Sequence, residues 1–203
     1  MIKRLILGTM QTNCYVVFNE NKDCLIIDPG ANGQKVARYI TENELHLQAI
    51  LLTHGHFDHV GAVDYLYQRY QCPIYTHHET IELLHNAKLN LSTFEEPFVV
   101  DAPIIDTEER FSINDFDIQW FLLEGHCQGS SMIYIESEDA LFSGDVLFAG
   151  SIGRFDFPTS STQKTKKTLQ FIKNMSFDAR LLPGHGEEST LKHEQNHNYY
   201  LKS

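Results

Sequence analysis

Thr53-His54-Gly55-His56-Phe57-Asp58-His59 is the most informative segment of the chain. It follows an apolar run at residues 49–52, which predicts a buried strand, and it precedes a stretch whose apolar side chains recur every three or four residues up to residue 70, which predicts a helix. In extended chain His54 and His56 point the same way, because side chains alternate with a period of two. Asp58 and His59 would follow in the first helical turn. Four potential ligands therefore converge on one strand-to-helix junction.

This residue set favours a metal site over a structural loop. Imidazole nitrogens and carboxylate oxygens suit zinc and other borderline divalent ions. The alternative is a polar loop whose histidines only cap the following helix. Three histidines and one aspartate within six residues, at 54–59, make that alternative improbable.

Three more polar residues follow predicted strands and have glycine beside them. Gly125-His126, Gly144-Asp145 and Gly184-His185-Gly186 come after the apolar runs that end at residues 123, 142 and 183. Glycine lets the backbone approach closely and adopt unusual dihedral angles. Sites in α/β architectures gather at strand ends, so the recurrence of this pattern predicts one shared site.

The remaining pattern alternates short strands with helices. We expect strands at residues 2–7, 15–18, 24–27, 48–52, 73–76, 111–113, 117–123, 132–135, 140–143 and 180–182, and helices at 34–43, from 58, at 162–175 and from 189 onward. Residues 78–88 permit a helix, and residues 90–103 read as a loop over one rim. Similar strand-and-helix plans occur in the two halves, and two packed mixed sheets with helices outside would accommodate them.

Length and composition narrow the class of protein. The 203 residues are 42% hydrophobic and 21% charged, which predicts one globular domain spanning 1–203. A formal charge of -11 disfavours binding to nucleic acid or to an anionic membrane. The four cysteines form no C-x-x-C pair, the N-terminal apolar run is too short for a signal peptide, and no run is long enough to cross a bilayer. We therefore expect a cytoplasmic protein.

The sequence His54-Gly55-His56-Phe57-Asp58-His59, followed by His126, Asp145 and His185, resembles the five-motif metal site of the metallo-β-lactamase superfamily over about residues 10–190. The segments at 144–154 and 182–186 are similar to those of the glyoxalase II (hydroxyacylglutathione hydrolase) branch in its short bacterial form. The resemblance implies an α+β fold of the αββα sandwich type, in which two mixed β-sheets pack together with helices on both outer faces. The metal site would lie at one edge of the sandwich.

The resemblance also implies how the ligands divide between two divalent ions, with zinc expected and iron or manganese as alternatives. His54, His56 and His126 would hold one ion; Asp58, His59 and His185 would hold the other; Asp145 would bridge them. In the superfamily the aspartate of Asp28-Pro29-Gly30 supports the metal loop. The two ions would deliver a bridging hydroxide to a bound carbonyl. Asp58 is expected to act also as a catalytic residue by orienting this nucleophile.

The expected reaction is hydrolysis of an S-acylglutathione-type thioester, such as S-lactoylglutathione to lactate and glutathione. Arg154 is the expected substrate-binding residue, because it stands where longer glyoxalase II enzymes have a lysine in Gly-Lys-Phe-Tyr; here the segment is Gly153-Arg154-Phe155-Asp156. Asp156 cannot replace that tyrosine. An Arg154–Asp156 pair that only shapes the loop is an equally weighted interpretation.

Other functions stay open. The Gly-Arg-x-Asp-Phe pattern at 153–157 also resembles persulfide dioxygenases, which use a single iron and consume oxygen; this is the first alternative. A lactonase would need the same hydroxide. We expect a β-lactamase to carry an export leader, and none is predicted here. Seven candidate ligands around an open site also disfavour a metal-storing or interaction domain.

Five of the histidines outside the predicted ligand set occur as close pairs or in a helix-permissive stretch. His77, His78, His85, His193 and His197 are expected at the surface, and Cys127 is expected to be a buried thiol rather than a ligand. We expect the protein to bind a small thioester and to bind neither nucleic acid nor a membrane. We expect it to be a monomer or a small homo-oligomer.

Overall fold

The computed structural model describes residues 1–202 and contains two six-stranded mixed β-sheets. The first sheet has the order β1 (Ile2–Leu7), β2 (Thr12–Phe18), β3 (Asp23–Ile27), β4 (His46–Leu51), β5 (Ile74–Thr76), β6 (Ile105–Asp106). The second has the order β12 (Ser189–Thr190), β11 (Arg180–Pro183), β10 (Ala140–Gly144), β9 (Ser131–Ile135), β8 (Phe116–Leu122), β7 (Arg110–Ile113). In the first sheet β3 to β6 run parallel; in the second, β10 and β11 form the parallel pair.

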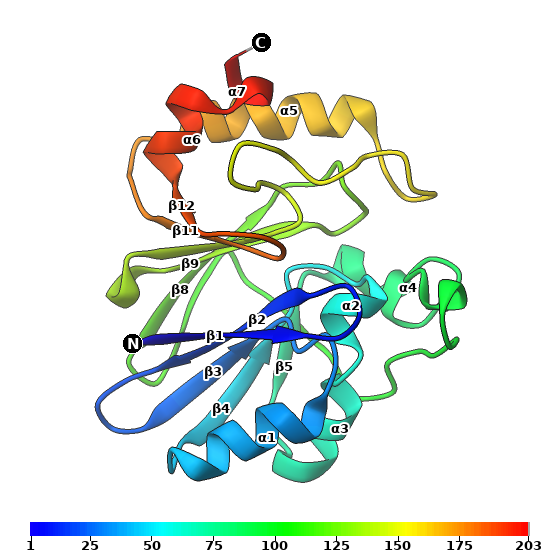
Figure 1. Ribbon diagram of the computed structural model, residues 1–203, viewed down its shortest axis with the longest axis vertical. Coiled ribbons are helices and arrows are strands. Elements are labelled where there is room, and N and C mark those ends of the chain that lie inside the picture. Colours follow the sequence, from blue (N-terminus) through cyan, green and yellow to red (C-terminus); the bar gives the residue numbers. More distant parts are fainter. Residues whose placement is uncertain (203) are drawn as a thin grey trace.

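Helices cover both outer faces of the paired sheets. They are α1 (Gly33–Glu42), α2 (Phe57–Val60), α3 (Val63–Tyr70), α4 (Ile81–Leu84), α5 (Thr162–Lys173), α6 (Leu191–His197) and α7 (Tyr199–Lys202), with short 3-10 turns η1 (His78–Thr80), η2 (Ser92–Phe94) and η3 (Glu136–Glu138). In Figure 1, α1 and α3 lie below the sheets and α5, α6 and α7 above them. This is the predicted αββα sandwich.

The alternation of side chains along the strands builds three apolar layers. In β3, Leu25 and Ile27 point between the two sheets, whereas Cys24 and Ile26 point toward α1 and α3. In β10, Phe142 joins the layer between the sheets and Leu141 faces the layer under α5. Strands buried on both faces explain why their sequences read as continuous apolar runs.

The structure corrects several predicted boundaries. The helix expected from residue 58 is interrupted after Val60 and resumes at Val63. Gly61 lies in the gap, where a Cβ atom would come within 2.5 Å of the Gly30 carbonyl oxygen, so the turn at 28–30 packs directly against the break. Residues 189–190 form the edge strand β12 before the last helices, and β6 lies just after the predicted rim loop of residues 90–103. Helix α4 ends at Leu84, four residues before the end of the helix-permissive stretch at 78–88.

Across residues 1–202, every helix is too short or too polar to traverse a lipid bilayer.

Candidate metal centre

The backbone leaving β4 is fixed by a buried aspartate. Asp28 follows β3, is 2% exposed, and accepts hydrogen bonds from the Thr53 amide (2.8 Å) and the Thr53 hydroxyl (2.6 Å). Because β3 and β4 are parallel neighbours, their carboxyl ends lie side by side at the same edge of the sheet, which brings Asp28 next to Thr53. His54 and His56 follow in buried positions.

The same carboxylate orients His59, which lies in α2. His59 Nδ1 is 2.9 Å from Asp28 Oδ2, and an Nδ1–H donor to that oxygen leaves Nε2 free to face the site. The close packing depends on Gly30, because a Cβ atom there would collide with the Asp58 carbonyl oxygen. The expected supporting role of Asp28 therefore has a direct structural counterpart.

The second sheet supplies the other three residues from its own strand ends. His126 follows β8, Asp145 follows β10, and His185 follows β11. His126 Nδ1 is 2.7 Å from the Arg154 carbonyl oxygen, so its Nε2 faces the cluster. Parallel pairing of β10 and β11 brings Asp145 and His185 to one edge.

All seven residues predicted as ligands lie in one cluster. His126 Nε2 is 2.9 Å from His56 Nδ1, and His54, His56 and His126 can each offer a ligand atom within 4.8 Å of one another. Asp58, His59 and His185 form a second such group, in which His185 Nε2 is 3.2 Å from Asp58 Oδ2.

Asp145 lies between the two groups. Its carboxylate oxygens are 3.3 Å from His59 Nε2, 3.6 Å from His126 Nε2 and 3.6 Å from His185 Nε2. The arrangement has the two ligand sets and the central carboxylate that the sequence predicts. That these residues hold metal ions stays a prediction.

Burial and neighbouring charges set the protonation of the cluster. Burial lowers the pKa of His54 well below its ordinary value and that of His56 to about 3, which favours the neutral imidazole that binds metals. Burial alone would also lower the pKa of His59, but Asp58 and Asp145 raise it well above the usual range. Burial would raise the pKa of Asp145, but His59 and His126 lower it to about 2, so this carboxylate is ionised at neutral pH.

The donor set fits divalent cations. His54 Nε2, His59 Nε2 and Asp145 Oδ1 are buried and have no hydrogen-bond partner within the described chain. Such atoms ordinarily cost about 1–3 kcal/mol each, and here they cluster around one point. Nitrogen and carboxylate ligands of this kind match zinc or iron.

Cys127 also lies beside His54, His56 and His126. Its thiol lies 3.0 Å from the Ser130 hydroxyl, and burial raises its pKa to about 12. The complete burial of Cys127 agrees with the expected buried thiol, and its exclusion from the ligand set stays a prediction.

An open cavity of about 540 Å³ adjoins the cluster and is lined by His56, Asp58, His126, Asp145 and His185. Arg154 also lines it, but its guanidinium donates two hydrogen bonds to Asp156 (2.7 and 2.9 Å) and lies 4.4 Å from the centre of the Phe157 ring. The structure thus contains the loop-shaping pair, while Arg154 remains at the mouth of the cavity.

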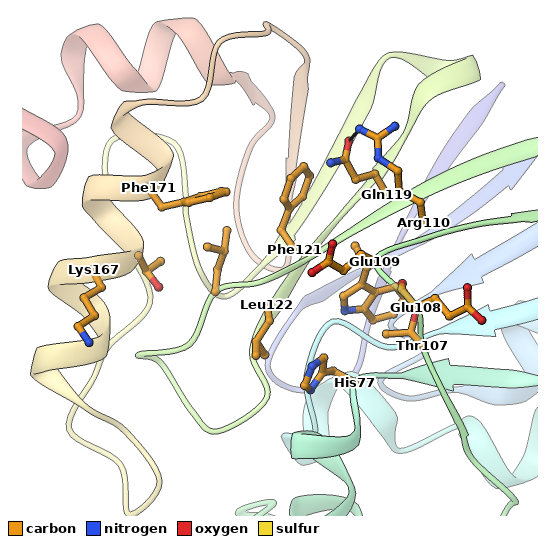
Figure 2. A pocket seen from close by; sticks show the side chains of 13 residues that line it. His77, Thr107, Glu108, Glu109, Arg110, Gln119, Phe121, Leu122, Lys167 and Phe171 are labelled. Atoms are coloured by element: carbon orange, nitrogen blue, oxygen red, sulfur yellow. Dashed lines mark hydrogen bonds between the residues drawn. The ribbon is translucent and has the colours of Figure 1, made fainter.

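A second cavity of about 610 Å³ lies between β8 and α5. Figure 2 shows Phe171 and Lys167 of α5 on one side, and His77, Thr107 and Glu108 on the other. None of the seven cluster residues lines it, so it is distinct from the candidate centre.

The structure adds residues that the sequence did not indicate. Thr12 Oγ1 donates a 2.8 Å hydrogen bond to Asp58 Oδ2, although Thr12 lies before the strand predicted at residues 15–18. Met10, Leu91, Phe94 and Phe148 line the cavity from three segments that are far apart in the sequence. No local motif marks them, because their proximity arises from the tertiary fold.

The fold and this cluster define the class of protein. The sequence model of the metallo-β-lactamase superfamily matches residues 7–185. The chain therefore belongs to the metallo-β-lactamase superfamily, whose members bind divalent metals.

Two curated relatives extend over nearly the whole chain. It is 36% identical to the probable metallo-hydrolase YqgX of Bacillus subtilis, over 98% of this chain and 96% of the relative. It is 30% identical to the hydroxyacylglutathione hydrolase GloC of Haemophilus influenzae, over 95% of this chain and 94% of the relative.

Solved structures agree with the fold. The BLEG-1 B3 metallo-β-lactamase superposes with a TM-score of 0.94 at 34% identity, with both chains fully covered. TTHA1623, solved in a di-iron-bound form, has a TM-score of 0.87 at 32% identity, covering 98% of this chain and all of the other.

Proposed function

We propose that this metallo-hydrolase of the metallo-β-lactamase superfamily cleaves thioesters of the S-acylglutathione type, with S-lactoylglutathione as the reference substrate. The observation that carries the proposal is the position of Asp145 between the two predicted ligand sets, in the lining of an open cavity. The similarity to GloC supports the choice of thioester.

We assign His54, His56 and His126 to one divalent ion, Asp58, His59 and His185 to the other, and Asp145 to both. When bound, such ions lower the pKa of a shared water and polarise a carbonyl group. The di-iron form of TTHA1623 supports a dinuclear centre, with zinc, iron or manganese as candidate metals. The chain's own contribution is to hold these side chains in place through Asp28 and the Arg154 carbonyl.

Asp58 is the proposed catalytic residue. Thr12 and His185 hold its Oδ2 at 2.8 and 3.2 Å, and the side chain borders the cavity. A carboxylate there can accept a hydrogen bond from the attacking water and orient it toward the acyl carbon. A thiolate leaving group needs little protonation because the pKa of a thiol is low, so the reaction does not require a general acid.

The test is hydrolysis of S-lactoylglutathione, other thioesters, a lactone and a β-lactam, with metal content measured on the same sample. We expect about two metal ions per chain, thioester cleavage, and no oxygen uptake. Asp58→Asn should lower kcat by about 10²–10⁴ while the protein stays folded. Unchanged turnover in this variant with both metals bound would remove the assigned role of Asp58.

The competing functions give different results in the same assay. One iron per chain with oxygen uptake on a persulfide would favour the dioxygenase. Cleavage of the lactone without any thioester would favour the lactonase. The β-lactam arm is included because BLEG-1 is described as a B3 metallo-β-lactamase, and preferred cleavage of that substrate would overturn the thioesterase proposal.

A further inference from the structure

The wall of the cavity beside the metal cluster is apolar. Met10 contributes from the β1–β2 turn, Leu91 and Phe94 from the segment around η2, and Phe148 and Phe157 from the loop after β10. Met10 is 51% exposed and Phe94 is 75% exposed. Large apolar side chains in such positions at the mouth of a polar site are typical of surfaces that contact a ligand.

The segment carrying Phe94 is braced from within. Asn90 and Ser92 are fully buried; Asn90 Oδ1 accepts from the Ser92 amide at 2.8 Å, and Asn90 Nδ2 donates to the Phe98 carbonyl oxygen at 2.9 Å. Leu91, between them, has a φ of 67°, a conformation that leucine rarely adopts. A strained residue held by buried polar side chains indicates that the wall is pre-organised in this shape.

A contact across the mouth joins two parts of this wall. Thr9 Oγ1 donates a 2.6 Å hydrogen bond to Glu95 Oε1, which links the turn carrying Met10 to the segment carrying Phe94. Glu95 also lines the cavity, so the mouth has a carboxylate beside its apolar side chains.

The charges at the cavity do not favour an anionic substrate tail. Arg154 is the one Lys or Arg side chain lining it among residues 1–202, and Asp156 already binds that guanidinium through two hydrogen bonds. Glu95 adds negative charge. A thiol carrier with two carboxylates, such as glutathione, would find one cation, already paired, outside the metal cluster.

We propose that Met10, Leu91, Phe94 and Phe148 form a subsite for an apolar chain on the thioester, so that preferred substrates carry an alkyl or aryl group on the acyl or the thiol side. This inference rests on the proposed thioesterase function: it keeps the thioester bond as the target and favours an apolar acyl group or thiol carrier over glutathione. Burial of each methylene against such a wall contributes roughly 0.8 kcal/mol, which corresponds to about a threefold to fourfold gain.

The test measures kcat/KM in two series with the metal-loaded enzyme. The first keeps N-acetylcysteamine as the thiol and lengthens the acyl group from acetyl to butyryl, hexanoyl and octanoyl. The second keeps the lactoyl group and compares glutathione, N-acetylcysteamine and thiols of increasing alkyl length. We expect kcat/KM to rise about threefold per methylene in at least one series, with S-lactoylglutathione below the best apolar thioester.

Phe94→Ala should lower kcat/KM for the longest responsive substrate about fivefold to tenfold, while the shortest changes less than about twofold. Phe171→Ala is the matched control, because Phe171 is also an exposed phenylalanine, at 48%, but lines the other cavity. A binding measurement complements the kinetics: the metal-free protein is titrated calorimetrically with 2-oxoalkyl thioethers, which cannot be hydrolysed and whose chain is lengthened on the acyl or the thiol side to match the responsive series. Their affinity should show the same chain-length trend, and Phe94→Ala should lose it.

The outcomes separate the two proposals. Two results would overturn the apolar subsite and leave the proposed thioesterase function intact. In the first, thioesters are hydrolysed but kcat/KM does not depend on chain length in either series. In the second, kcat/KM for S-lactoylglutathione is at least tenfold higher than for every apolar thioester. Chain-length-dependent binding of the thioethers without cleavage of any thioester supports the subsite and overturns the proposed reaction.

Discussion

Asp28 is a buried side chain that orients a proposed metal ligand, His59. Replacing it with Asn keeps the shape but converts one oxygen into a donor. If the new NH2 group faces His59 Nδ1, that nitrogen must accept the hydrogen bond, so the imidazole carries its proton on Nε2 and points an N–H at the cluster. If the NH2 group faces Thr53 instead, it meets the Thr53 amide N–H, and neither group can accept a hydrogen bond. We expect Asp28→Asn to weaken metal binding by about 10–100-fold, measured by competition with a chromophoric chelator.

Asp23→Asn provides the matched control for this substitution. Asp23 also lies in the β3 segment and also accepts side-chain hydrogen bonds, from Gln48 at 2.8 Å and Asn114 at 3.0 Å, but it does not contact the cluster. Its variant should bind metal as the wild type does. Equal affinities in Asp28→Asn and the wild type would show that the orientation of His59 does not depend on Asp28.

Among the elements, sequence predicted those with a periodic signal and missed those held by tertiary contacts. The β4–α2 junction was predictable because an apolar strand directly precedes a dense set of ligand residues. The interruption of the helix after Val60 could not be predicted, because it depends on the close approach of Gly30 from another segment of the chain. The wall around Leu91 was read only as a loop, because its conformation depends on the buried side chains of Asn90 and Ser92 rather than on periodicity.

Helix α6 and the residue after it stabilise the loop that borders the cavity. Asn198 is fully buried, and its Nδ2 donates to the carbonyl oxygens of Phe148 (3.3 Å) and Ser151 (3.0 Å) and to Glu194 Oε2 (2.9 Å). Glu194 in turn accepts from the Gly150 amide at 2.8 Å. The C-terminal segment therefore positions the backbone that carries Phe148.

We expect Asn198→Ala to lower the free energy of unfolding by about 1–3 kcal/mol, because buried acceptors lose their donor. Amide exchange at Phe148 and Ser151 should also become faster in native conditions. Asn196→Ala is the control: its Nδ2 donates to the Lys192 carbonyl oxygen on the exposed side of the same helix, at 2.8 Å. Unfolding in urea and hydrogen exchange measure both effects, and equal results for the two variants would contradict the positioning role.

At the scale of the whole molecule, the candidate centre joins two halves of the chain. His54, His56, Asp58 and His59 follow a strand of the first sheet, whereas His126, Asp145 and His185 follow strands of the second. The apolar layer between the sheets already holds the halves together without metal. Bound cations would add a second link at the edge of the sandwich and would stabilise only the folded state.

Metal removal should therefore lower the stability of the entire protein. A metal present at about 100 times its Kd stabilises the native state by about 2.7 kcal/mol, which corresponds to roughly 5–10 °C in Tm for a chain of this size. Differential scanning calorimetry with excess zinc and with EDTA measures the difference. Asp145→Asn should lose most of it, because Asp145 lies between both ligand sets.

A paired control distinguishes this effect from zinc bound at the surface. The exposed rings of His193 and His197 stack at 4.4 Å on α6, and a surface pair of this kind can attract zinc without taking part in the centre. The double variant His193→Gln, His197→Gln should keep the full zinc-dependent rise in Tm. If that variant loses the rise while Asp145→Asn keeps it, the stabilising metal binds at the surface of α6 and the assigned link between the two sheets is wrong.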